Sequence, residues 1–163
     1  MGIEAEFVKD IAARFNWAFV RVNNAVNQLD DQQLWHRPSS KSNSVGIILQ
    51  HLTGNLNQWV LDALGGREYK RNRPLEFEDS QKRSRSEIAA GFAALGTSVQ
   101  EVVLKIDPDS LLTPCRIQET DQTILSALLS AITHMDLHTG QILYIAKMLL
   151  NERYVEARRV TKP

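Results

Sequence analysis

The chain has 163 residues, 43% of them apolar and 23% charged, and its 19 basic side chains balance its 19 acidic ones. This length and composition are typical of one globular domain. The zero net charge argues against a nucleic-acid or membrane partner. The sequence has no run of about 18 apolar residues, so no membrane span is predicted. One cysteine, Cys115, excludes an intrachain disulfide, and the residues after Met1 lack the pattern of a signal peptide, so the expected location is the cytoplasm.

The first predicted element is an amphipathic helix from Ile3 to Leu29. Its apolar side chains recur every three or four positions, as a helix packed on a core requires. They are Phe7, Ile11, Phe15, Ala18, Val22, Ala25 or Val26, and Leu29. Pro38 then prevents a helix from continuing. Just before it, Trp35 is expected to cover one end of the core and His36 to lie on the surface.

The second predicted helix begins at Ser42 or Ser44, either of which can cap it, and ends near the pair Gly65-Gly66. At about 100° per residue, His51 falls on the flank of its apolar stripe, and Asn55 lies near the same line. A polar line beside a core stripe can be plain surface or the wall of a cleft.

Residues 67–82 form the most charged part of the chain and show no helical period. They predict a long ordered connection across the bundle, anchored by Leu75 and Phe77. Two interpretations of Lys70, Arg71 and Arg73 remain open. They are solvated loop charges, or one arginine lies over a site and binds an anionic substrate group through two hydrogen bonds.

The third predicted helix opens with a capping box, Ser84 followed by Glu87. Its core stripe consists of Ile88, Phe92, Leu95, Val99, Val102 and Ile106. Asp107-Pro108 ends it. Residues 111–118 are expected to be an extended connection in which Cys115 is a small, half-buried side chain.

The fourth predicted helix runs from Thr120 or Asp121 to Asn151. Its apolar positions cover more than half of its circumference, whereas a surface helix needs a stripe only a little wider than about 100°. The surplus predicts contact with a second copy of the chain, that is, a homodimer. We therefore expect one domain at residues 1–151, followed by a basic tail at residues 152–163.

Four long helices with long connections between them predict an all-α four-helix bundle. His134 and His138 are four residues apart and therefore neighbours on one helix face. Together with His51 they would form a three-histidine site with free coordination positions for a divalent metal. Zinc, nickel, manganese and iron all suit such a site, and zinc or nickel is the metal expected. The HxxxH spacing is equally compatible with surface or hydrogen-bonded core histidines.

The sequence also resembles a known family. Residues 44–52 (SVGIILQHL) are similar to the start of the second helix in the DinB/YfiT-like superfamily, and His134-x-x-x-His138-x-Gly140-Gln141-Ile142 is similar to its fourth helix. The DinB of this name is unrelated to the DNA polymerase. Residues 54–59, the Gly65-Gly66 pair and the Arg73-x-x-Glu76-Phe77 loop resemble a subgroup of unknown function. The resemblance implies a DinB/YfiT-like four-helix bundle, often dimeric, in which His51, His134 and His138 bind a divalent metal.

For activity, the resemblance implies a metal-dependent enzyme acting on a small molecule. Some relatives transfer low-molecular-weight thiols such as bacillithiol or mycothiol, and others are labelled as metal-dependent hydrolases. Asn55, Gln141 and Arg73 are expected to orient metal ligands or substrate. No general base is identified, because Asp136 points away from the histidines on the helix. The alternative is a non-catalytic, dimeric metal-binding bundle.

Overall fold

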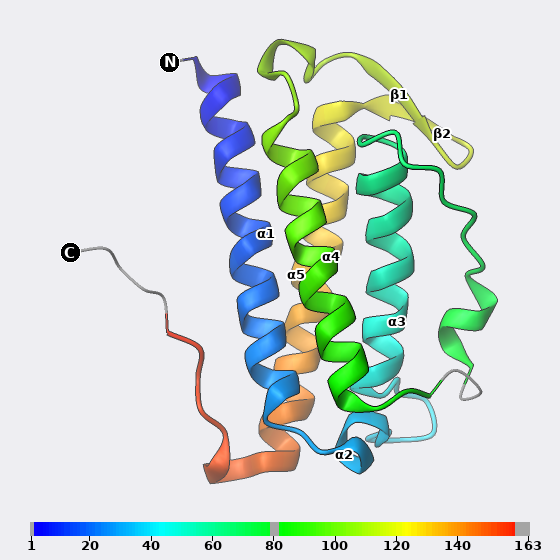
Figure 1. The fold of residues 1–163 in the computed structure, drawn as a ribbon, viewed down its shortest axis with the longest axis vertical. Coiled ribbons are helices and arrows are strands. Elements are labelled where there is room, and N and C mark those ends of the chain that lie inside the picture. Colours follow the sequence, from blue (N-terminus) through cyan, green and yellow to red (C-terminus); the bar gives the residue numbers. More distant parts are fainter. Residues whose placement is uncertain (1, 79–81, 159–163) are drawn as a thin grey trace.

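Four long helices lie side by side along one axis of the molecule (Figure 1). A computed structural model describes residues 2–78 and 82–158. The long helices are α1 (Ile3–Asn27), α3 (Val45–Leu56), α4 (Arg85–Leu104) and α5 (Ile124–Leu150). The short elements are helix α2 (Asp31–Trp35) and the antiparallel strands β1 (Pro114–Ile117) and β2 (Thr120–Thr123). The prediction of an all-α four-helix bundle is confirmed.

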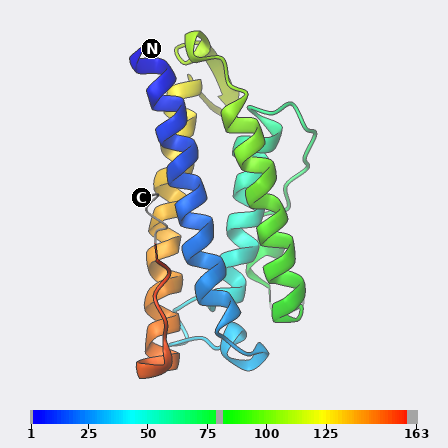
Figure 2. The same cartoon turned by 60° about the vertical axis from the view of Figure 1, so that its left-hand side comes forward.

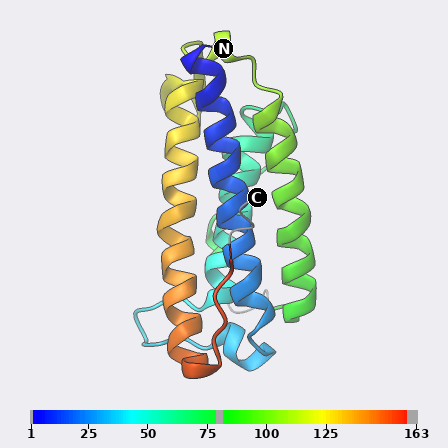
Figure 3. The same ribbon diagram turned by 90° about the vertical axis from the view of Figure 1, so that its left-hand side faces the viewer.

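The core lies between the four helices. Helix α1 packs between α4 and α5, and α3 lies behind it on the far side of the bundle (Figures 2 and 3). The largest fully buried side chains include Phe15, Leu34, Ile47, Leu49, Leu52, Leu56, Leu128, Met135 and Ile142. Because α3 and α5 face each other across this core, polar residues on the flank of each helix can meet at its edge.

Local capping residues set where helices α3 and α4 begin. The Ser44 side chain accepts a hydrogen bond from the Ile47 amide at the start of α3. At the start of α4, Ser84 and Glu87 form the predicted capping box. The predicted start of the fourth helix at Thr120 or Asp121 is wrong, because residues 120–123 pair with residues 114–117 as a β-hairpin.

Helix α3 continues as a π-helical segment, η1 (Asn57–Asp62), in which the backbone winds more widely than in an α-helix. It ends at the predicted glycine pair. Gly66 has a φ of 68°, a left-handed conformation that a glycine adopts without strain. The Gly66 and Arg67 amides bond back to the Asp62 and Leu61 carbonyls, which closes the end of the helix.

Helix α2 is an element that the sequence patterns did not indicate. It is one short turn with a capping box between Asp30 and Gln33, and its last residue, Trp35, lies on the start of α3. A Cβ at Gly46 would be 2.5 Å from the Trp35 ring, so a glycine is needed there. The Trp35 indole N–H also donates to the Arg83 carbonyl at 3.0 Å, tying this end of the bundle to the chain before α4.

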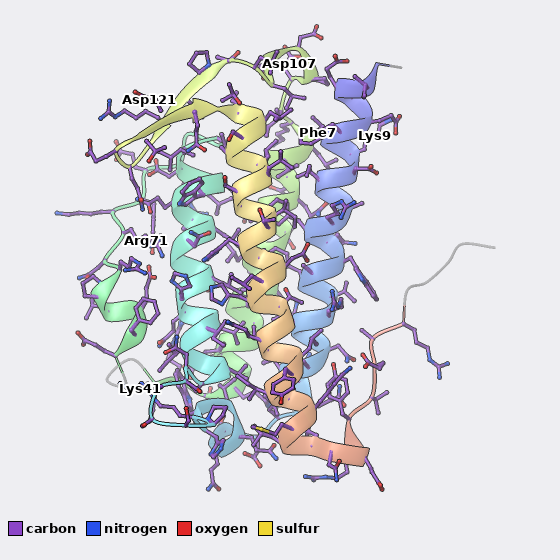
Figure 4. All side chains as sticks on the ribbon, turned by 180° about the vertical axis from the view of Figure 1, so that it is seen from behind. Phe7, Lys9, Lys41, Arg71, Asp107 and Asp121 are labelled. Carbon is purple, nitrogen blue, oxygen red and sulfur yellow. The ribbon has the colours of Figure 1, made fainter. Side chains whose placement is uncertain are left out.

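The connection between η1 and α4 runs along the outside of α3 (Figures 1 and 4). As predicted, residues 67–73 form no helix. They lead into a 3-10 turn, η2 (Pro74–Phe77). One prediction here is wrong, since Leu75 is 39% exposed and does not anchor the connection, whereas Glu76 is buried.

Two further features concern the exterior of the bundle. By length and composition, α4 is the one described helix that could cross a membrane, a test that core helices of soluble proteins also pass. It buries Ile88, Phe92 and Val99 against the other helices. The predicted basic tail is described only to residue 158. In this part, the Val155 backbone bonds to the side chains of Asn24 on α1 and of Gln28, the residue after α1.

Candidate metal centre

The candidate site lies between α3 and α5, which are neighbours in the view of Figure 4. His51 comes from the middle of α3 and is 7% exposed. His134 and His138 come from successive turns of α5, where the spacing of four residues places them on one face. The structure therefore brings together the three histidines singled out in the sequence.

The three imidazoles turn their Nε2 atoms toward one another. His134 Nε2 is 3.1 Å from His51 Nε2 and 3.2 Å from His138 Nε2, and one nitrogen from each of the three rings lies within 4.8 Å of the others. Nitrogens bound to one tetrahedral zinc at about 2.05 Å would be about 3.3 Å apart. The cluster has the dimensions of a metal site and could hold a divalent ion.

Hydrogen bonds at the Nδ1 atoms of His51 and His138 determine which tautomer each ring adopts. His51 Nδ1 is 2.9 Å from the Glu76 carboxylate, which can only accept, so this nitrogen carries the proton. His138 Nδ1 donates in the same way to Gln141 Oε1 at 2.7 Å. Both Nε2 atoms therefore present lone pairs toward His134. A neutral His134 can donate to only one of them, whereas a cation at the centre would satisfy all three rings.

The surroundings keep the three rings neutral. Burial lowers the pKa of His134 to about 4, and repulsion from His138 and His51, were they protonated, and from the cations Arg71 and Arg73 adds to this effect. Burial also lowers the pKa values of His51 and His138, against the opposing hydrogen bonds from Glu76 and Gln141. Neutral imidazole is the form that binds metals.

The buried carboxylate of Glu76 is the site residue whose role the sequence did not indicate. It is 8% exposed and accepts from Arg71 Nε at 2.6 Å and from Arg71 NH2 at 2.7 Å, a paired arrangement. Arg71 NH2 also lies 3.3 Å from His51 Nδ1; since both groups are donors, that approach is not a hydrogen bond. Carboxylates that hold the outer nitrogen of a ligand histidine fix its orientation and make it a better ligand.

Further contacts support this carboxylate. A Cβ at Gly54 would overlap with Glu76 Oε1, so the glycine lets the connection approach α3 closely. Gln58 Oε1 accepts from Arg71 NH1 at 3.1 Å and from Gln118 in the β-hairpin at 2.8 Å. The one indication of Glu76 in the sequence is its place in the Arg73-x-x-Glu76-Phe77 loop of the resembling subgroup. The loop has no helical or strand period, so the sequence does not predict that Glu76 is buried.

Asn55 and Arg73, the other two residues expected to orient ligands or substrate, make no hydrogen bond to the three histidines among the described residues. Asn55 is 8% exposed, and its Oδ1 is buried without a partner among the described residues, as is His134 Nδ1. The Arg73 guanidinium lies 5.3 Å from the centroid of the Phe77 ring, which in turn is 5.1 Å from that of His51.

The cysteine and the fourth histidine of the chain lie outside the three-histidine cluster. Cys115 is half-buried on β1, where burial raises the pKa of its thiol. His36 follows α2 and is only partly buried.

Fold and site together define a class of protein: a DinB-like four-helix bundle with a three-histidine cluster compatible with metal binding. The chain belongs to the family described as protein of unknown function (DUF1572), whose model matches residues 2–158. The fold is similar to that of a DinB-like protein from Bacillus cereus ATCC 10987, with a TM-score of 0.69, 15% identity, and coverage of 86% of this chain and 91% of that one.

A second solved structure agrees. The DinB-like protein YjoA from Bacillus subtilis has a TM-score of 0.69 and 14% identity, and the match covers 91% of this chain and 99% of that one. Both likenesses concern the fold alone, and they confirm the fold that the resemblance implied. The comparison with curated proteins returned no match.

Proposed function

We propose that this protein is a metal-dependent enzyme whose three-histidine centre binds a small-molecule substrate in the cytoplasm, with no nucleic-acid or membrane partner. The observation that supports it best is the convergence of three Nε2 atoms, two of which present lone pairs because of their outer hydrogen bonds. The described cluster offers three ligands, and zinc or nickel held by three histidines keeps coordination positions for other ligands.

The chemistry supplied by a divalent metal held here is to lower the pKa of a bound thiol or water, which produces a nucleophile near neutral pH. The chain's own part is to position the ligands. Glu76 and Gln141 hold the outer nitrogens of His51 and His138, and the Phe77 ring covers His51.

The engagement of Glu76 favours thiol transfer over hydrolysis. Among the described residues, Glu76 is the carboxylate that contacts the histidines, and it is bonded to both His51 and Arg71. It is thus poorly placed to take a proton from substrate. A thiol ionises near pH 8.5 even before it binds a metal, so it needs less help from a protein base than water does. A thiol S-transferase is therefore the version of the enzyme that fits best, with a hydrolase second.

Metal analysis tests the proposal. Purified protein, or protein reloaded with zinc or nickel and desalted, should contain about one metal ion per chain, and His138→Ala should lose it. His36→Ala removes a histidine outside the cluster and should keep the full metal content. A wild-type chain that takes up neither metal would refute the site.

Turnover separates the transferase from the hydrolase. The zinc-loaded protein is mixed with 2-mercaptoethanol or cysteine and a chromogenic electrophile, and separately with ester and amide substrates. The transferase predicts thiol consumption that disappears with His138→Ala. Turnover of esters or amides alone would establish the hydrolase version instead.

A specific observation supports the second candidate, a non-catalytic dimeric metal-binding bundle. Helix α5 leaves large apolar side chains exposed, with Leu137 at 61%, Tyr144 at 73% and Met148 at 48%. A second copy of the chain packed on this helix would cover them. Sedimentation that finds a dimer, together with bound metal and no turnover in either panel, would favour this candidate. A monomer would remove it.

A further inference from the structure

We propose that Arg73 is the anion-binding residue of this site, and that the substrate carries a negative charge close to the atom that binds the metal. This inference rests on the proposed metal centre and names the class of substrate that it takes.

The charge balance leaves a bound divalent ion without a counter-charge. Its three ligands are neutral imidazoles. Glu76 is the described carboxylate in contact with them, and its charge is matched by Arg71 through hydrogen bonds of 2.6 and 2.7 Å. With the rings neutral, the charged side chains that act on His134 are Arg71 and Arg73, and both are cationic. Such a site favours an anionic ligand over a neutral one, since opposite charges attract strongly where water is scarce.

Arg73 is the cation placed to meet such a ligand. Its guanidinium lies 5.3 Å from the centroid of the Phe77 ring, and that ring lies 5.1 Å from the centroid of His51. The side chain is exposed, and among the described residues it makes no ion pair. An unpaired guanidinium resting on an aromatic face keeps its donors free, and they match a carboxylate through two parallel bonds.

The two cations that precede Arg73 most closely in the connection, Arg71 and Lys70, are less well placed to bind such a ligand. Arg71 is occupied by Glu76 and by Gln58. Lys70 lines a hollow of about 380 Å³ together with Gln50, Thr53 and Glu76; none of the three histidines lines it, and Lys70 is not among the charges that act on them. Because Lys70 belongs to the same connection and carries the same charge, it provides a matched control.

The experiment uses cobalt-loaded protein and three thiols that share a sulfur but differ in the charge of the other end. The thiols are 3-mercaptopropionate (negative), 2-mercaptoethanol (neutral) and cysteamine (positive). The absorption band of a thiolate bound to cobalt reports binding of each. In the wild type we expect the anionic thiol to bind most tightly. Arg73→Gln should weaken its binding about fivefold, the size of one favourable exposed ion pair, and leave 2-mercaptoethanol unchanged.

The variants carry the controls. Lys70→Gln removes the same charge and should change none of the three affinities, whereas Arg73→Lys should retain part of the preference because it keeps the charge but loses the paired donors. Equal affinities in wild type and Arg73→Gln, an equal effect of Lys70→Gln, or cobalt-loaded protein that binds none of the thiols would each overturn the inference and leave the metal centre standing. Protein that takes up no cobalt would overturn the metal centre itself, and the inference with it.

Discussion

Replacing Glu76 by glutamine tests whether the carboxylate positions a metal ligand. The change keeps the size of the side chain and removes the charge that His51 and Arg71 share. A glutamine has one acceptor oxygen in place of two, so its NH₂ group must face either the Arg71 guanidinium or the His51 N–H, donor against donor. We expect metal affinity to fall 10- to 100-fold, which corresponds to about 1.4–2.8 kcal/mol.

The same change also acts on the fold. The Arg71 side chain is only 6% exposed, and leaving one member of a buried ion pair without its partner costs about 3–5 kcal/mol. The double variant Arg71→Met with Glu76→Gln removes both charges and should recover most of that stability. It should not recover the metal affinity, because His51 still lacks its carboxylate.

Two measurements separate these effects. Zinc affinity is measured by competition with a chromophoric chelator, and the free energy of unfolding by urea titration of the metal-free protein. If Glu76→Gln is less stable but binds zinc as tightly as the wild type, Glu76 only anchors the connection, and its role at the metal site is refuted. Glu76→Asp keeps the charge and should lie between the two proteins in affinity.

Three further predictions concern pH, a glycine and the cysteine. Metal-free protein should lose stability as the pH falls from about 6.5 to about 4, because histidines of the unfolded chain take up protons near pH 6.5, whereas folded His134 does so only near pH 4. Urea midpoints measured across this range should show the loss. The variant His134→Gln should show a smaller loss. Gly54→Ala should displace Glu76 and lower zinc affinity about tenfold, whereas Gly91→Ala, whose added Cβ meets nothing within 4 Å, should leave it unchanged. Cys115→Ser should retain full zinc content by metal analysis, and a loss of zinc would place the thiol in the site.

The features predicted correctly from the sequence depend on local spacing. The helical period located all four long helices, and hydroxyl side chains at Ser44 and Ser84 marked two of their starts. The histidines of α5 meet because four residues make about one turn. The meeting of His51 with them depends on how two helices pack. Its place on the flank of the apolar stripe made it the candidate third ligand, and the resemblance to a known family implied the same set.

The features that were missed depend on contacts between distant segments. Burial of Glu76 results from an arginine five residues earlier and a histidine 25 residues earlier in the chain, and no local pattern encodes it. The β-hairpin turns at Gln118, a non-glycine residue with a φ of 55°, so the usual glycine signal of a turn is absent. Helix α2 is a single turn, too short for a period to be recognised.

In the proposed site, the helices hold the metal ligands, and the connection supplies the charged side chains around them. The rigid helices α3 and α5 fix the three ligand nitrogens, so substitutions there should change whether metal binds at all. Among the described residues, the charged side chains that act on the ligand histidines all belong to the connection: Arg71, Arg73 and Glu76. Because loops tolerate change better than packed helices, relatives with the same three histidines can differ in the charge of this connection, and we expect the charge of their substrates to differ with it.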